Sequence, residues 1–158
     1  MTKGTKAGVI YFIDTCSLTE LRRTYPKAHF PQVWAMLDRL AKEGRLLSVD
    51  EVYEELLVQD DEVAEWAEEN EDLFLELDAA IQNQAKTILK QFPTLVDLKK
   101  SKSGADPFLI AAAVVRRGTV VTQEKKSGGS PAAKIPDVCK ALNIPCITLL
   151  GVIQAEGL

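Results

Sequence analysis

The sequence has few cysteines, a single histidine and no long apolar run. Its three cysteines, Cys16, Cys139 and Cys146, form no closely spaced pair, which argues against a zinc site or a disulfide framework and favours reduced thiols. No stretch of about 18 apolar residues is present, so we expect no transmembrane helix. The N-terminal residues lack an apolar signal region with a cleavage site, so we expect a short tail that leads into a strand. The odd number of cysteines without a framework favours a cytoplasmic setting.

The motifs of several common enzyme classes are absent as well. Neither a G-x-G-x-x-G loop after the first apolar run nor a G-x-x-x-x-G-K-[ST] loop is present. Dehalogenase-type phosphoaspartyl sites need Asp-x-Asp after the first strand, and receiver domains need a pair of acids there, but Asp14 stands alone and position 16 is Cys. We expect no catalytic role for His29, which lies in a turn-like AHFP segment. Nor do we expect Cys16 to be a nucleophile, because the adjacent Asp14 disfavours a thiolate.

Charge is distributed unevenly along the 158-residue chain, although the net charge is only −4. Residues 60–78, which we call the acidic segment, carry ten acids and neither Lys nor Arg, whereas Lys and Arg recur from Lys86 onward. One interpretation is a solvated acidic face with ordinary surface lysines. The other is a basic rim for an anionic substrate beside an acidic segment that binds a different partner.

Short apolar strands alternate with amphipathic helices along the chain. We expect strands over residues 8–13, 45–50, 119–123 and 144–150. We expect helices over residues 31–43, from 50 onward, through the acidic segment, and over 71–92, 106–117 and 135–143, with a turn or helix at 151–157. Trp34 and Trp66 are expected in the core. The alternation predicts one domain over residues 1–158 with an α/β fold, a three-layer α/β/α sandwich around a central, mainly parallel sheet of four to five strands.

Four acidic residues lie where strands end or helices begin. They are Asp14 after the first strand, Glu55 in the helix after the second, Asp106 at a helix start and Glu124 after the strand at 119–123. Because the carboxyl ends of parallel strands share one edge of a sheet with the following helix starts, we expect these acids to converge. Clustered carboxylates repel one another, and a divalent cation removes this repulsion. Mg²⁺ or Mn²⁺ suits such oxygen ligands and supports attack on a phosphodiester.

Two of these acids are also well placed to cap helices. Asp106 followed by Pro107 is a good N-cap with proline in the first helical turn. Asp14 follows a strand that looks buried, and a charge in that position needs a partner. Capping a nearby backbone would supply one without any cation. Both interpretations therefore stay open for these residues.

The other two acids have equally simple alternatives. Glu54 adjoins Glu55 on the same helix, which leaves the identity of the second acid open. Glu124 could pair with Lys125 or Lys126 in the loop that follows it. Hydroxyl groups near the acids could orient ligands or waters, or could simply stabilise turns. These hydroxyl residues are Thr15, Ser17 and Thr122.

The sequence resembles the PIN-domain superfamily through four motifs that occur in the order of its signature. These motifs are YFIDTCSL at 11–18, VYEEL at 52–56, GADPFLIAAA at 104–113 and VVTQE at 120–124. The stretch KIPDVCKALNIPCITL at 134–149 resembles the closing helix and strand of a subgroup of uncharacterised bacterial and archaeal PIN-like proteins. The resemblance runs from about residue 8 to residue 150, and it implies a PIN-like fold.

The resemblance implies a role for each acid. Asp14 would be the central metal ligand, with Glu55 the second, Asp106 the third and Glu124 the fourth. Glu55 fits the family pattern better than Glu54 because Leu56 follows it directly. Thr122 would position a water or the phosphate, supported by Thr15 or Ser17. The family implies Mg²⁺- or Mn²⁺-dependent cleavage of RNA, often by the toxin of a toxin–antitoxin pair, with an antitoxin protein as partner and frequent homodimers.

The sequence departs from the family pattern at Cys16, where Asn or Ser is usual, at Glu124, where Asp is usual, and in the acidic segment. Our main hypothesis is a metal-dependent endoribonuclease in which Lys125, Lys126 or Lys134 holds the RNA backbone. The alternative is a catalytically silent PIN-like module that binds a protein or nucleic acid. A nuclease acting on DNA is a third hypothesis, since nothing in the sequence separates RNA from DNA.

Overall fold

A parallel β-sheet runs through the middle of the molecule. The computed structural model describes residues 8–59, 61–95, 104–125 and 133–158. Its sheet has the strand order β3-β2-β1-β4-β5, and each pair of neighbouring strands is parallel. The strands are β1 (Tyr11–Ile13), β2 (Leu46–Val49), β3 (Phe74–Leu75), β4 (Thr119–Val121) and β5 (Cys146–Ile147). The predicted sheet of four to five parallel strands is confirmed.

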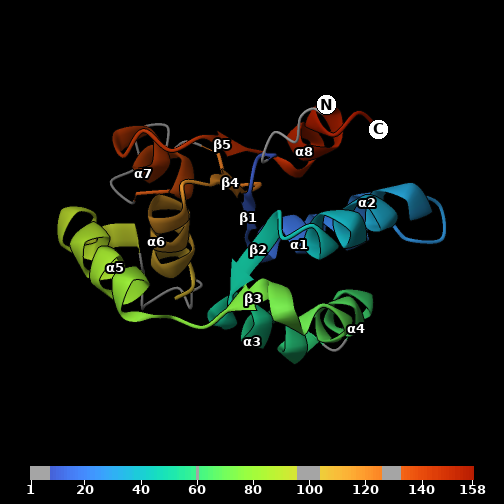
Figure 1. The fold of residues 1–158 in the computed structure, drawn as a ribbon, viewed down its shortest axis with the longest axis horizontal. Helices are drawn as coiled ribbons and strands as arrows, with labels where there is room; N and C mark the ends of the chain where they lie inside the picture. The colour runs from blue at the N-terminus through green and yellow to red at the C-terminus, as the bar shows by residue number, and fades with distance from the viewer. Residues whose placement is uncertain (1–7, 60, 96–103, 126–132) are drawn as a thin grey trace.

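Helices cover both faces of this sheet, as Figure 1 shows. In the described part of the chain they are α1 (Thr15–Thr24), α2 (Pro31–Lys42), α3 (Asp50–Gln59), α4 (Glu62–Glu69), α5 (Ala79–Gln91), α6 (Asp106–Arg116), α7 (Ile135–Ala141) and α8 (Leu149–Ala155). Helices α5, α6 and α7 lie on one side of the sheet, α1, α2 and α8 lie on the other, and α3 and α4 lie near β3 (Figure 1). The predicted three-layer α/β/α sandwich is therefore confirmed.

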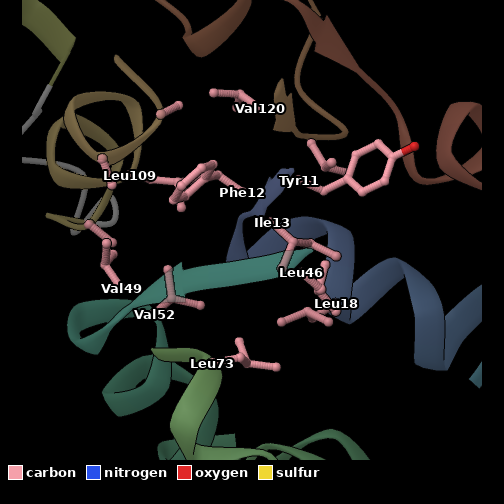
Figure 2. Close-up of a cluster of buried hydrophobic side chains, with 14 of the residues drawn as sticks. Tyr11, Phe12, Ile13, Leu18, Leu46, Val49, Val52, Leu73, Leu109 and Val120 are labelled. Atoms are coloured by element: carbon pink, nitrogen blue, oxygen red, sulfur yellow. The ribbon is translucent and has the colours of Figure 1, made fainter. Parts of the chain in front are cut away.

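Strand β1 is enclosed by apolar side chains on both faces (Figure 2). Its residues Tyr11–Ile13 are each at most 1% exposed. The Phe12 ring points toward Leu109 of α6, while Leu18 of α1 lies near Ile13 on the other side. A β-carbon added at Gly118 would come within 2.3 Å of the Phe12 ring, so glycine is needed before β4 to let the two strands pair. The core thus fixes the position of β1, on which the site depends.

The strand order changes direction between β1 and β4. From β1 the chain runs outward through β2 to β3, and β4 then returns to the other side of β1. Ile13 of β1 pairs with Val121 of β4. Asp14 and Thr122, which follow these residues, therefore emerge side by side at the carboxyl ends of the two strands. Open α/β sheets form ligand sites at such a switch point.

The helix predicted over 71–92 begins later than the sequence indicated. Residues Glu71–Leu73 form a 3-10 turn, and β3 follows directly from it. Phe74 of β3 pairs with Ser48 of β2, so sheet pairing outweighs the helical spacing of the apolar residues here. Helix α5 begins only after Asp78, whose Oδ1 accepts a hydrogen bond from the Ile81 N–H at 2.9 Å. This N-cap sets the true start of the helix.

Two other boundaries also differ from the prediction. Residues 15–24 form helix α1, for which the sequence analysis assigned no element. The strand predicted over 144–150 is confined to β5, because Thr148 caps α8 by accepting a hydrogen bond from the Gly151 N–H at 3.1 Å. The terminal turn or helix predicted at 151–157 is thus part of a helix that begins at Leu149.

The remaining expectations for the scaffold are confirmed. The helices predicted over 31–43 and 135–143 correspond to α2 and α7. Trp34 and Trp66 are only 2% and 4% exposed, as expected of core residues. None of the helices in the described ranges is long and apolar enough to cross a membrane.

A polar junction ties the end of α8 to the start of the sheet. The Glu156 carboxylate accepts hydrogen bonds from the Tyr11 hydroxyl at 2.8 Å and from Arg45 at 2.7 and 3.2 Å. Burial raises the pKa of Glu156, but the bonds from Arg45 and Tyr11 lower it, and the net shift is downward. Burial and the bond to Glu156 raise the pKa of Tyr11 to about 12. The ionised carboxylate therefore stabilises the fold.

We expect Glu156→Gln to lower the free energy of unfolding by about 2 kcal/mol near pH 7, because charge-assisted hydrogen bonds are lost. The pKa of Glu156 is lowered by folding, so its contribution is present above the unfolded-state pKa and is lost as the pH falls through the folded-state value. In urea titrations the difference in free energy of unfolding between the variant and the wild type should become smaller below about pH 4. The control Glu69→Gln, on an exposed position of α4, should change stability by less than about 0.5 kcal/mol. If the difference in free energy of unfolding stayed constant down to acid pH, the ionised Glu156 carboxylate would not be the stabilising group.

Candidate functional site

The site is built around Asp14 at the carboxyl end of β1. Its backbone N–H donates to the Val121 carbonyl at 3.1 Å, which continues the pairing of β1 with β4. The Thr122 hydroxyl then donates to Asp14 Oδ2 at 2.5 Å. Asp14 and Thr122 are only 4% and 1% exposed. The contact between these two residues follows from the register of two neighbouring parallel strands.

Asp14 also caps helix α1. Its Oδ1 accepts a hydrogen bond from the Ser17 N–H at 2.8 Å, and Ser17 Oγ donates to the Val121 carbonyl at 3.2 Å. The structural interpretation of Asp14 as a cap is therefore correct, and it does not exclude a second role. Burial raises the pKa of Asp14, although hydrogen bonds from Thr122, Cys16 and Ser17 oppose the shift. The charged form of Asp14 is thus destabilised by its burial.

Cys16 contributes a further donor to the same carboxylate. Its Sγ donates to Asp14 Oδ2 at 3.0 Å. Burial, followed by the negative charge of Asp14, raises the pKa of the Cys16 thiol to about 12. The thiol therefore stays protonated, in agreement with the expectation that Cys16 is not a nucleophile.

The four acids that the sequence analysis selected line one cavity of about 500 Å³. These acids are Asp14, Glu55, Asp106 and Glu124. They come from the end of β1, from α3, from the start of α6 and from the residues after β4. The geometry therefore brings together residues that are separated by up to 110 positions, as expected from the shared edge of the sheet.

Of the two neighbouring acids on helix α3, Glu55 lines this cavity and Glu54 does not. The Thr15 hydroxyl donates a hydrogen bond to Glu55 Oε1, which links α3 to the start of α1. Glu54 is exposed and lines a separate cavity with Glu51, which Glu55 also borders. The position of Thr15 beside Glu55 also agrees with the supporting role expected for its hydroxyl.

The prediction that Asp106 is the N-cap of its helix is wrong. Ala105 occupies the cap position with helical backbone angles, and Asp106 is the first residue of α6, followed by Pro107. Asp106 is 8% exposed and lines the cavity. Its carboxylate lies in the first turn of a helix, where the macrodipole favours negative charge.

Glu124 is held by the start of α7. Its Oε1 accepts a hydrogen bond from the Ile135 N–H at 3.1 Å, and its own N–H donates to Thr122 Oγ1 at 3.1 Å. The additional methylene of Glu, compared with the Asp of the family pattern, lets the carboxylate bridge from β4 to this helix. Lys126, one of its two suggested ion-pair partners, lies outside the described residues.

The two described lysines that were suggested to hold the RNA backbone lie in different parts of the structure. Lys125 lines a second cavity of about 560 Å³, together with Lys140, and this cavity shares Glu124 with the first. Lys134 is the N-cap residue of α7, and its N–H donates to Asp137 at 2.9 Å. Lys125 is therefore the better placed of the two described candidates.

Further polar side chains line the first cavity and were missed by the sequence analysis. They are Thr19, Glu20 and Arg23 of α1, Gln59 of α3, and Gln123 after β4. Once α1 is known to begin at Thr15, residues 15, 19 and 23 fall at helical spacing on one face. Recognition of Asp14 as an N-cap would have revealed this face.

The donor set suits a hydrated Mg²⁺ or Mn²⁺ ion better than an all-protein cage. Among the residues that the structure describes, no three His, Cys, Asp or Glu side chains are grouped closely enough to hold a metal ion. The four carboxylates of the cavity are nevertheless the hard oxygen donors that Mg²⁺ prefers, and Mg²⁺ keeps several waters while binding through one or two carboxylates. The residues therefore fit such an ion in their chemistry.

We expect Asp14→Asn to raise the free energy of unfolding at pH 8 in the presence of a chelator. Asp14 has a raised pKa, so its ionised form costs stability once the pH exceeds that pKa, and the neutral amide removes this cost while it can still cap α1. Urea titrations at pH 8 and pH 5 should show a smaller difference at the lower pH. An Asn variant that is less stable at both pH values would show that Asp14 acts only as a cap.

Comparison with solved structures supports the fold. A chain of VapBC2 from Rickettsia felis, solved bound to a DNA fragment from its promoter, aligns with a TM-score of 0.52 and 17% sequence identity. The alignment covers 88% of the present chain and 98% of that chain. At this identity the similarity concerns the fold alone, which agrees with the PIN-like fold expected from the sequence.

Comparison at the level of sequence identifies the family but supplies no activity. No curated protein sequence matches the chain. One family model, described as a domain of unknown function (DUF4411), matches residues 11–158. The match spans most of the chain and includes all four acids of the cavity. The protein therefore belongs to the DUF4411 family.

Proposed function

We propose that the protein is a metal-dependent endoribonuclease that hydrolyses RNA phosphodiester bonds. One observation carries the proposal: four acids from four separate elements line a single cavity at the switch point of a parallel sheet. In this proposal Asp14, Glu55, Asp106 and Glu124 are the metal ligands. When bound, Mg²⁺ or Mn²⁺ would neutralise charge on the phosphate and lower the pKa of a water.

The chain itself would orient the reacting groups. The Thr122 hydroxyl bonds both Asp14 and the backbone of Glu124, so it fixes two of the acids relative to each other. Arg23 is the cationic side chain among the residues lining the cavity, and it is 71% exposed. It can therefore turn toward a phosphate that enters from solvent. Lys125 would contact the adjoining nucleotide from the second cavity, and Lys126 and Lys134 remain proposed backbone contacts.

The biological setting is part of the same proposal. The structural neighbour VapBC2 was solved bound to DNA, and its fold is shared by this chain. Together with the resemblance to PIN domains, this supports a cytoplasmic toxin with an antitoxin protein as partner. A homodimer is part of the same proposal, and DNA remains an alternative substrate because nothing in the sequence separates RNA from DNA.

A catalytically silent module is the second candidate, and one observation favours it. Both oxygens of Asp14 accept hydrogen bonds from within the protein, from Ser17, Thr122 and Cys16. A carboxylate satisfied in this way has less need of a cation. Such a module would bind its partner through the acidic segment or the loop that follows Glu124.

Cleavage assays on the full chain distinguish the two candidates. We expect Mg²⁺- or Mn²⁺-dependent cleavage of single-stranded RNA, reduced at least about 100-fold by Asp14→Asn or Glu55→Gln, because loss of a ligand should exceed the effect of losing an outer-shell partner. Glu54→Gln is the matched control: it removes the same charge one residue away, outside the cavity, and should keep activity within about threefold.

Two results would overturn the nuclease proposal. One is cleavage that survives Asp14→Asn in a preparation free of contaminating nuclease. The other is no cleavage and no Mn²⁺ binding by calorimetry in the wild-type chain, which would favour the silent module. Loss of activity in Glu54→Gln but not in Glu55→Gln would instead reverse the assignment of the second acid.

A further inference from the structure

The second cavity lies next to the acid cavity, which is the name we use for the cavity lined by the four acids. Val121 of β4 pairs with Ile147 of β5, and the Thr122 N–H donates to the Ile147 carbonyl at 3.0 Å. Neighbouring strands lie about 4.8 Å apart, so the carboxyl ends of β1, β4 and β5 open onto adjacent sites. Figure 1 shows β5 beside β4 at this end of the sheet. The two cavities are therefore consecutive positions along one edge.

Only a thin partition separates the two cavities. Thr122 lines the second cavity, and its hydroxyl donates at 2.5 Å to Asp14, which lines the acid cavity. Glu124 lines both cavities. The Glu124 carboxylate is held in place by the Ile135 N–H of α7 at 3.1 Å. A ligand that reaches the acids can therefore continue past Glu124 into the second cavity.

The two cavities differ in the chemistry of their walls. Among the described residues that line the acid cavity, none is aliphatic or aromatic. The second cavity combines two exposed lysines, Lys125 and Lys140, with a wall of partly buried apolar side chains, which are Pro136, Ile144 and Ile147. Apolar walls favour burial of the face of a nucleobase, and ammonium groups bind phosphate. The volume of about 560 Å³ is in the usual range for a small-molecule site.

We propose that the second cavity is a subsite for one nucleotide of the RNA, next to the phosphate that is cleaved. This inference rests on the proposed nuclease function, because that function places the reacting phosphate among the four acids. The base of the nucleotide would lie against Ile144 and Ile147. Lys125 and Lys140 would contact its second phosphate, which points away from the acids. The negative charge of the substrate is thus balanced by lysines in one cavity and by the cation in the other.

The subsite should bind a nucleotide without strong selection of the base. Aliphatic contacts are not directional, and none of the described residues that line this cavity carries an amide or guanidinium group, the groups that most often read base edges. The Thr148 hydroxyl accepts a hydrogen bond from the Gly151 N–H at 3.1 Å and still has a proton to donate. Because a hydroxyl can serve either a base or a ribose oxygen, it adds affinity more than specificity. We therefore expect the four ribonucleoside monophosphates to bind within about fivefold of one another.

The first test is a titration of the full chain with adenosine 5′-monophosphate (AMP), followed by amide NMR in the presence of a chelator. The amide signals of Ile147 and Thr148 should shift. AMP should bind at least about tenfold more tightly than inorganic phosphate, because the base buries apolar surface. Phosphate that binds as tightly as AMP would show an anion site without a base pocket. That result, or AMP shifts that spare Ile147 and Thr148, would overturn the proposal.

Variants of exposed lysines supply a second test. Lys140→Ala should weaken AMP binding at least about threefold, because an ammonium group that contacts the phosphate is lost. Lys86→Ala is the matched control: it removes the same charge from an exposed position of α5 and should change the affinity by less than about 1.5-fold. Ile144→Ala should weaken the binding of AMP but not of phosphate. Equal effects of the two lysine variants would show non-specific attraction and would contradict the subsite.

These measurements separate the subsite from the nuclease proposal, since AMP binding requires neither a cation nor cleavage. A chain that binds AMP in the second cavity but cleaves no RNA would contradict the nuclease proposal and keep the nucleotide site. A chain that cleaves RNA but shows none of the AMP shifts would contradict the subsite alone. In an active chain, Lys140→Ala should raise KM and leave kcat within about twofold, as expected for a contact made equally in the ground state and the transition state.

Discussion

The contact between the Asp14 carboxylate and the Thr122 hydroxyl is the interaction on which the site depends. It exists because Ile13 and Val121 are paired in neighbouring parallel strands, so that the next residue of each strand emerges at the switch point. Asp14 in turn starts α1, which supplies one wall of the acid cavity. A single buried carboxylate thus connects the order of the strands to the shape of the site.

This arrangement carries an electrostatic cost that a purely structural cap would not need. Burial raises the pKa of Asp14, and three other acids line the same cavity. Asp61, which is half-buried, and Asp78, which is exposed, also cap helices, but neither is as deeply buried as Asp14. Natural proteins tolerate such destabilised groups where function requires them. The electrostatic cost of burying the Asp14 carboxylate beside three other acids is the physical reason for proposing a cation at this edge of the sheet.

Much of this arrangement could be predicted because it depends on local patterns. Alternating strands and helices predict the parallel sheet, and the sheet predicts that acids at strand ends converge. The family pattern already favoured Glu55 over Glu54, and the contact of Glu55 with the Thr15 hydroxyl of α1 comes only from the packing of α3 against α1. The pairing of β3 with β2 overrode the helical spacing around Phe74, and Ala105 replaced Asp106 as a cap. These features depend on contacts between distant segments, which sequence spacing does not encode.

The central claim is that the acid cavity, and not the acidic segment, binds a divalent cation. Paramagnetic broadening of amide NMR signals by substoichiometric Mn²⁺ tests it most directly, because the acidic segment offers a larger cluster of negative charge elsewhere in the chain. The account predicts that the amide signals of Ser17, Thr122 and Gln123 disappear first, while those of α4 persist. Broadening that begins in α4, or that leaves Ser17 and Thr122 unchanged, would contradict it.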